Sequence, residues 1–188
     1  MKSWLMGIKR LKACKEAIEW GEQFDAPGKA WQECERGEGM LWLLGKLSGK
    51  PGSDSRKKLV LAACGCARLS LPYVPKGEIR SLRAIETAEA WARGDAGITL
   101  QMVKAAAYAA YAAYYAAYAA DAYAADDAAS YAAYAAYAAA ADAYAADDAA
   151  SYADYAAYYA AYAAARKATL KKCADIVRQH YPEAPEVK

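Results

Sequence analysis

The sequence predicts an all-α fold, a single helical bundle domain with a long region of alanine and tyrosine. Apolar residues recur at spacings of three and four along the chain, and no stretch alternates at period two for long enough to indicate a sheet. Residues 105–165 hold 37 Ala and 15 Tyr among 61 residues, without Gly or Pro, and alanine is the strongest helix former. The length of 188 residues and the 57% of hydrophobic residues suit one domain with a substantial core.

The first predicted helix spans about residues 5–21, where apolar side chains recur on one face and Gly21 acts as a stop. A second helical region over residues 30–47 is expected to break at Gly37–Gly39, because glycine is a poor helix former. The large side chains of this second region are expected in the core: Trp31, Cys34, Leu41, Trp42 and Leu44.

A loop is expected over residues 49–55, which read GKPGSDS. Either Asp54 or Ser55 can cap the third helix, because its side-chain oxygen can accept a hydrogen bond from a free backbone N–H of the first turn. Pro72 and Pro75 are expected to end this helix, since the residue before a proline is restricted to extended conformations.

A fourth helix is predicted over about residues 78–93, and Gly94 stands where a C-terminal glycine cap belongs. Thr99 is a suitable N-cap for the alanine-rich region that follows. The side chains of the fourth helix that are expected to face the core are Ile79, Leu82, Ile85 and Trp91.

Tyrosines form stripes within the alanine-rich region. From Tyr108 to Tyr118 they stand at offsets 0, 3, 6, 7 and 10, which places them on one helix face, and the same spacing returns from Tyr152 to Tyr162. The sequence DAYAADDAASY also occurs twice, 21 residues apart. We expect three helices rather than one continuous rod, with breaks near the repeated aspartates, so that the stripes turn toward a shared interior.

These stripes have two interpretations. Tyrosine can be the large filler of an alanine-spaced bundle, in which its hydroxyl needs a partner when buried. The stripes can instead line a groove that binds a ligand or a partner protein, as aromatic-rich interfaces do. The candidate residues for such a groove are Tyr108, Tyr111, Tyr115, Tyr152, Tyr155 and Tyr159.

Charge divides the chain into an acidic and a basic part. Residues 105–165 carry seven Asp and no cation, whereas the rest of the chain has 24 cations and 15 carboxylates, a net charge of +9. We expect a basic helical body over residues 1–98, an Ala/Tyr-rich helical region over residues 99–181 that packs on it, and a tail over residues 182–188. The cations are dispersed and no aromatic residues are interleaved with them, so nucleic acid is not expected as a partner.

The residues that catalysis and metal binding need are scarce. His180 is the single histidine, so we expect no enzyme, no metal site and no cofactor. The five cysteines are scattered and odd in number, which predicts buried free thiols in a reducing compartment. No apolar segment has the length of a signal peptide or a membrane span, so a cytoplasmic protein without a membrane partner is expected.

Five segments outside the alanine-rich region resemble a known family. They are RLKACKEAIEW (Arg10–Trp20), AWQECERGEGMLWLL (Ala30–Leu44), CARLSLPYV (Cys66–Val74), RAIETAEAWARG (Arg83–Gly94) and KKCADIVRQHYP (Lys171–Pro182). Together they are similar to the all-α immunity protein family of bacterial toxin–immunity systems, whose members also look common in phage genomes. The resemblance implies a protein that neutralises a toxin or a host-defence component by binding it rather than by turnover.

Two other functions stay open. A phage-type protein could sequester a small nucleotide signal, for which phosphates need Arg or Lys and bases need aromatic faces. The Tyr/Ala helices could also build a self-assembling scaffold, which would be a homo-oligomer. In the alternative interpretation, both Trp residues of the second helical region belong to the core and Arg68 caps a helix end. The candidate ligand-binding or partner-binding residues in the family-like segments are Trp31, Arg36, Trp42, Arg68 and Tyr73.

Overall fold

The computed structural model describes residues 2–74, 76–119 and 162–187. These residues form eight α-helices and one short 3-10 turn, and no strand occurs among them. The prediction of an all-α bundle is therefore confirmed. Within the same ranges, no helix combines the length and the apolar character that crossing a membrane requires.

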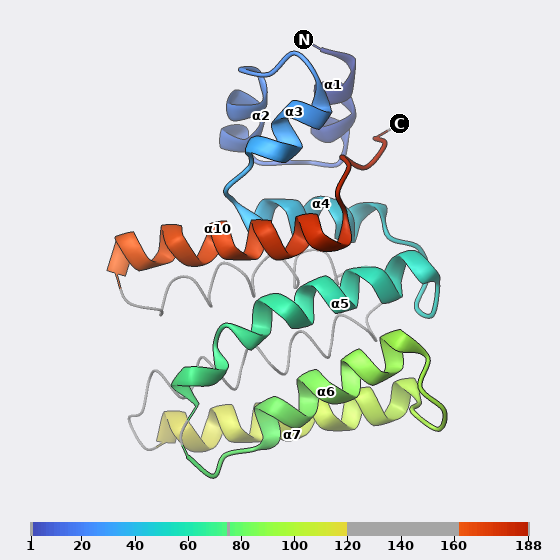
Figure 1. The fold of residues 1–188 in the computed structure, drawn as a ribbon, viewed down its shortest axis with the longest axis vertical. Coiled ribbons are helices and arrows are strands. Elements are labelled where there is room, and N and C mark those ends of the chain that lie inside the picture. The colour runs from blue at the N-terminus through green and yellow to red at the C-terminus, as the bar shows by residue number, and fades with distance from the viewer. Residues whose placement is uncertain (1, 75, 120–161, 188) are drawn as a thin grey trace.

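Most of the helices form one stack, with a group of short helices at its end. Figure 1 shows α5 between the pair α4 and α10 on one side and the pair α6 and α7 on the other, while α1–α3 gather beyond α4 near both chain ends. The helices are α1 (Ser3–Arg10), α2 (Lys15–Gly21), α3 (Pro27–Glu33), α4 (Gly37–Leu47), α5 (Asp54–Arg68), α6 (Arg80–Arg93), α7 (Leu100–Ala119) and α10 (Tyr162–His180), and the 3-10 turn is Leu71–Tyr73.

Helix α5 is central because it is apolar on two faces. Val60 and Cys64 belong to a core shared with α6 and α7, whereas Leu59 and Cys66 belong to a second core shared with α4 and α10. All four side chains are buried. Other helices cover both of these apolar faces, and α5 thereby joins the two halves of the bundle.

The prediction of one continuous first helix is wrong. The chain forms α1 and α2 instead, with a turn between Arg10 and Lys15 in which Lys12 has a positive φ of 66°. The apolar spacing continues across this turn, so periodicity alone does not reveal it. The turn lets the two short helices pack against each other.

The break in the second helical region exists, but it lies before the predicted glycines. Helix α3 ends at Glu33, and Gly37 begins α4. Trp31, Leu41 and Leu44 are buried as expected. The side chains of Cys34 and Trp42 are only half-buried, and of the two only Cys34 packs against this core.

The third helix begins at a different cap from the two that were predicted. Ser53 caps α5, since its Oγ accepts a hydrogen bond from the backbone N–H of Arg56 at 3.3 Å. Asp54 is already the first helical residue. Helix α5 ends at Arg68, before either predicted proline, and Pro72 lies in the 3-10 turn that follows.

The fourth helix largely matches its prediction. Ile85 and Trp91 are buried, and Gly94 caps α6 with a left-handed φ of 83°. Ile79 precedes the first turn of α6 and is exposed, so its predicted place in the core is wrong. Leu82 is half-buried. Thr99 acts as the predicted cap, because its Oγ1 accepts a hydrogen bond from the Met102 backbone N–H at 3.2 Å.

Alanine makes up much of the core between α6 and α7, and no tyrosine of the described residues belongs to it. Ala107 and Ala110 are buried there with Ala84 and Ala88, and such small side chains let two backbones approach closely. Tyr108 is 61% exposed, so for this residue the predicted inward orientation is wrong. The division of the alanine-rich region into helices between Ala119 and Tyr162 falls outside the described residues.

The cysteines are free, and their burial is uneven. Cys64, Cys66 and Cys173 are buried within the bundle, as predicted. Cys34 is half-buried and Cys14 is exposed, so the prediction of burial is wrong for Cys14. Cys14 lies directly before α2, outside both cores.

Candidate functional site

The short N-terminal helices, α4 and the C-terminal segment enclose a cleft of about 1120 Å³. Four of the five tryptophans of the chain line it, and we call it the tryptophan cleft. Trp91 lies elsewhere, in the core that α5 shares with α6 and α7. The four cleft tryptophans are Trp4 from α1, Trp20 from α2, Trp31 from α3 and Trp42 from α4.

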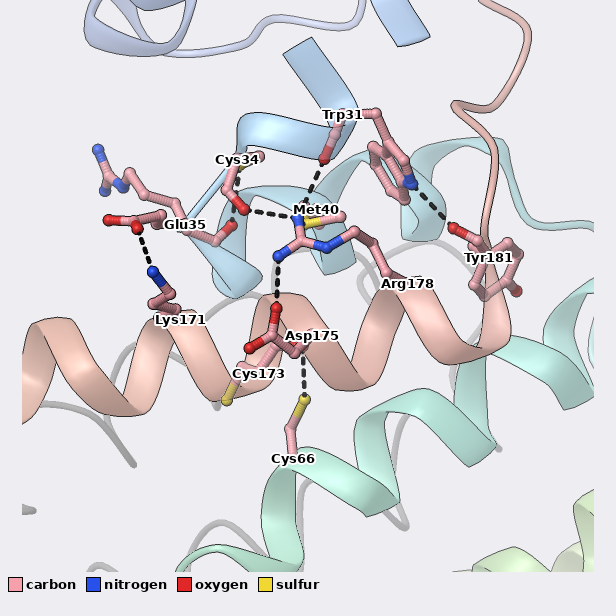
Figure 2. A network of polar contacts seen from close by, with 11 residues as sticks. Trp31, Cys34, Glu35, Met40, Cys66, Lys171, Cys173, Asp175, Arg178 and Tyr181 are labelled. Atoms are coloured by element: carbon pink, nitrogen blue, oxygen red, sulfur yellow. Dashed lines mark hydrogen bonds and ion pairs between the residues drawn. The ribbon is translucent and has the colours of Figure 1, made fainter. Parts of the chain in front are cut away.

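Helix α10 holds the inner wall of this cleft in place through Arg178. The guanidinium of Arg178 donates hydrogen bonds to the backbone oxygens of Trp31 at 3.1 Å and Cys34 at 2.7 Å, as Figure 2 shows. It also donates to Oδ1 of Asp175, one turn back on α10, at 2.7 Å. Arg178 therefore binds the free carbonyl groups at the end of α3, where a cation also complements the helix dipole.

Two further contacts join the same elements. The indole N–H of Trp31 donates to the backbone oxygen of Tyr181 at 2.8 Å, just beyond α10. Lys171 on α10 donates to Oε1 of Glu35 at 2.7 Å, as Figure 2 also shows. This hydrogen bond and the charge of Lys171 lower the pKa of Glu35, so its carboxylate stays ionised.

The charged residues around the cleft are mainly acidic. Five glutamates and three cations line it, which opposes the expectation of a basic surface beside aromatic residues. At the start of α4, Arg36 and Glu38 form an ion pair, with Arg36 Nε 2.7 Å from Glu38 Oε1. This hydrogen bond raises the pKa of Arg36. The lining charges are Glu16, Glu33, Glu35, Glu38 and Glu186 against Lys12, Arg36 and Lys167.

The cleft contains two thiols. Cys14 and Cys34 both line it, and burial raises the pKa of Cys34, which keeps this thiol protonated and a poor nucleophile. His180 does not line the cleft. Within the described residues, no group of three His, Cys, Asp or Glu side chains is placed to hold a metal ion. The arrangement suits binding of an apolar or aromatic surface with a few charged contacts.

The structure brings together three of the five candidates from the family-like segments. Trp31, Arg36 and Trp42 line the tryptophan cleft, with Trp31 also part of the core. Arg68 does not join them, because its guanidinium forms two hydrogen bonds with Glu89 of α6, at 2.8 and 2.7 Å. Tyr73 ends the 3-10 turn, and its side chain lies outside the described part of the structure.

The tyrosine candidates are not part of this cleft as far as the structure describes them. Tyr108 is exposed on α7, on the opposite side of the stack from α1–α3. Tyr111 and Tyr115 continue α7, but their side chains lie outside the described part, as do residues 152, 155 and 159 as a whole. The groove predicted from the stripes therefore stays a prediction.

Sequence reasoning missed three of the residues that make the cleft. Trp4 and Trp20 lie on helices that were predicted as one, and Glu38 follows a glycine that was expected to break the helix. The density of tryptophan was an available signal, because four of the five occur within the first 42 residues. That density indicates a large aromatic surface near the N-terminus.

Comparison with known proteins gives no relative on which to base a function. No family model, no curated protein and no solved structure matches this chain. The tryptophan cleft is therefore interpreted from its own geometry and chemistry.

Proposed function

We propose that this chain is a non-enzymatic binding protein that neutralises a protein toxin or a defence effector by holding a segment of it in the tryptophan cleft. The observation that carries the proposal is the convergence of Trp4, Trp20, Trp31 and Trp42 on one cleft. Tryptophan, with tyrosine and arginine, is enriched among the residues that dominate protein–protein binding energy.

The size of the cleft favours a protein segment over a small molecule. Its volume of about 1120 Å³ lies just above the roughly 300–1000 Å³ that small-ligand pockets occupy. The resemblance to immunity proteins supplies the biological setting, since such proteins act by occupying a partner. A peptide segment with one or two large side chains fits a cleft of this volume and lining.

The lining charge disfavours a nucleotide in this cleft. A nucleotide signal carries phosphates, and phosphates gain from Arg and Lys rather than from carboxylates. Five carboxylates against three cations would repel such a ligand. Sequestration of a nucleotide therefore gains no support from this cleft.

Two exposed glycines allow a matched test of the proposal. Gly39 on α4 lines the cleft and Gly28 on α3 does not, and a Cβ added at either position meets no atom within 4 Å. A photo-cross-linking amino acid at Gly39 should capture the neutralised protein in cells, whereas the same group at Gly28 should capture far less of it.

A growth assay then connects binding to neutralisation. The chain is co-expressed with each product of the neighbouring genes that arrests growth on its own. The wild type and Gly28→Phe should restore growth against one of them, and Gly39→Phe should not, because its ring occupies the cleft. Equal protection by Gly28→Phe and Gly39→Phe would overturn the proposal. So would a wild-type chain that protects against none of these products, together with no protein captured by the cross-linking group at Gly39.

A further inference from the structure

Two buried polar atoms in the tryptophan cleft lack a partner. Oε2 of Glu38 and the indole N–H of Trp4 are both inaccessible to solvent and make no hydrogen bond with any described residue. Both residues line the cleft. Buried polar groups in native proteins are nearly always hydrogen-bonded, so a group bound at this cleft would gain by pairing with this one acceptor and this one donor.

Glu38 is the more informative of the two. Its side chain is only 8% exposed, yet within the described ranges its carboxylate pairs with Arg36 alone, which bonds to Oε1 and is itself 59% exposed. An ionised carboxylate can accept several hydrogen bonds, and leaving one oxygen buried without any is costly. A ligand that donates to Oε2 would remove this cost, so binding there is favoured over binding to an exposed carboxylate.

The surroundings of Glu38 favour a cation as the donor. Glutamates outnumber cations along the cleft by five to three, and indole rings attract cations to their faces. The protein already shows this contact at the cleft wall, where Lys46 Nζ lies 5.7 Å from the centre of the Trp42 ring. Carboxylate and indoles together therefore select a positively charged side chain.

We propose that the tryptophan cleft holds an arginine side chain of the bound protein, whose guanidinium donates to Oε2 of Glu38 while its plane lies on an indole ring. Arginine fits better than lysine because its guanidinium is planar, stacks on aromatic faces and offers five donors in a fixed fork. A backbone carbonyl of the same bound segment accepts from the indole N–H of Trp4. This inference rests on the proposed function, because it names the side chain by which the partner protein is recognised.

The probe for this site is Nα-acetyl-arginine methylamide, which carries the side chain and two backbone amides. Its control is the matching citrulline derivative, in which a neutral urea replaces the guanidinium. Binding is followed by the five indole N–H signals in nitrogen–proton correlation spectra of the full chain. The signals of Trp4 and at least one other cleft tryptophan should shift, and that of Trp91 should not, because Trp91 belongs to a separate core.

The expected affinity pattern distinguishes charge recognition from apolar contact. The arginine derivative should bind about tenfold or more tightly than the citrulline derivative, because a hydrogen bond between two charged groups is roughly twice as strong as a neutral one. Glu38→Gln should abolish this preference, whereas Glu86→Gln, a change of an exposed carboxylate on α6 outside the cleft, should keep it. Equal binding of the two derivatives to the wild type overturns the inference, whether or not Glu38→Gln folds.

The two proposals fail in different ways. If the arginine derivative binds as expected but Gly39→Phe still protects cells, the cation site exists and the proposed function of the cleft is wrong. If Gly39→Phe abolishes protection while the derivatives bind equally, the cleft is the site of neutralisation and the partner is not recognised by arginine.

Discussion

At the scale of single residues, Arg178 holds part of the candidate site in place although it does not line the cleft. Its side chain is 17% exposed and donates to the backbone oxygens of Trp31, in the last turn of α3, and Cys34, just beyond α3, as well as to Asp175. Such a guanidinium fixes the direction in which the chain leaves α3. The positions of Trp31 and Arg36 on either side of Cys34 follow from it.

Replacement of Arg178 tests this role. Arg178→Ala should lower the free energy of unfolding by about 2 to 4 kcal/mol, because two partly buried carbonyl groups lose a charged donor. Arg83→Ala, a change of an exposed arginine on α6, should cost less than about 0.5 kcal/mol. Urea denaturation of both variants measures the difference, and similar midpoints for the two would contradict the role assigned to Arg178.

His180 gives the stability of the protein a predictable dependence on pH. Burial lowers the pKa of His180 below its ordinary value of about 6.5, and the charge of Lys58 lowers it further. The unfolded chain therefore takes up this proton at a higher pH than the folded chain, so stability is lost as the pH falls below about 6.5.

The chain has a single histidine, so this effect can be isolated. Between about pH 7 and pH 5.5 the free energy of unfolding of the wild type should fall, and that of His180→Gln should stay nearly constant. Carboxylates with a lowered pKa, such as Glu35, change the free energy of unfolding only at more acidic pH. Parallel pH profiles for the two proteins would show that another group governs this window.

At the scale of helices, the crossing of α4 over α10 depends on a glycine. A Cβ at Gly37 would overlap Cβ of Cys173 and lie 2.7 Å from the backbone nitrogen of Ala174. Gly39, one residue beyond Glu38 on the same helix, has no atom within 4 Å of an added Cβ. The two glycines therefore have opposite roles, one in packing and one on the surface.

Alanine substitutions at these two positions should change stability in opposite directions. Gly37→Ala should destabilise the protein by about 1 to 3 kcal/mol, because α4 must move away from α10. Gly39→Ala should stabilise it by up to about 1 kcal/mol, because alanine is the better helix former. Thermal and urea unfolding measure both, and a Gly37→Ala protein as stable as Gly39→Ala would show that the two helices do not approach this closely.

The sequence predicts elements better than it predicts their contacts. Periodicity and caps identify α6 with Gly94 and the start of α7 with Thr99, because these signals are local. The turn at Lys12 could not be predicted in this way, because the apolar spacing continues through it. Trp31, Arg36 and Trp42 could be selected as candidates from motifs, but their meeting with Trp4 depends on how α1–α3 pack, which no local signal encodes.

At the scale of the whole molecule, the C-terminal segment connects the group α1–α3 to the rest of the bundle. Residues 184–187 line the tryptophan cleft, and the side chain of Val187 lies against Gly7 of α1. Gln32 on α3 also donates through Nε2 to the backbone oxygen of Pro182 at 2.6 Å. Figure 1 shows this segment running from the end of α10 toward the N-terminal helices. These contacts indicate that α1–α3 owe part of their stability to a segment distant in sequence.

Removal of residues 182–188 should therefore loosen one part of the molecule and leave the other unchanged. The backbone amides of α1 and α2 should exchange with solvent about tenfold faster, because the free energy of local opening falls when packing is lost. The amides of α5 and α6 should keep their exchange rates, since both buried faces of α5 lie against α4, α6, α7 and α10. A chain that lacks only Lys188 is the matched control and should behave as the full-length protein. Equally faster amide exchange in all helices would mean that the segment stabilises the bundle as one cooperative unit. Unchanged exchange in α1 would mean that the segment does not stabilise α1.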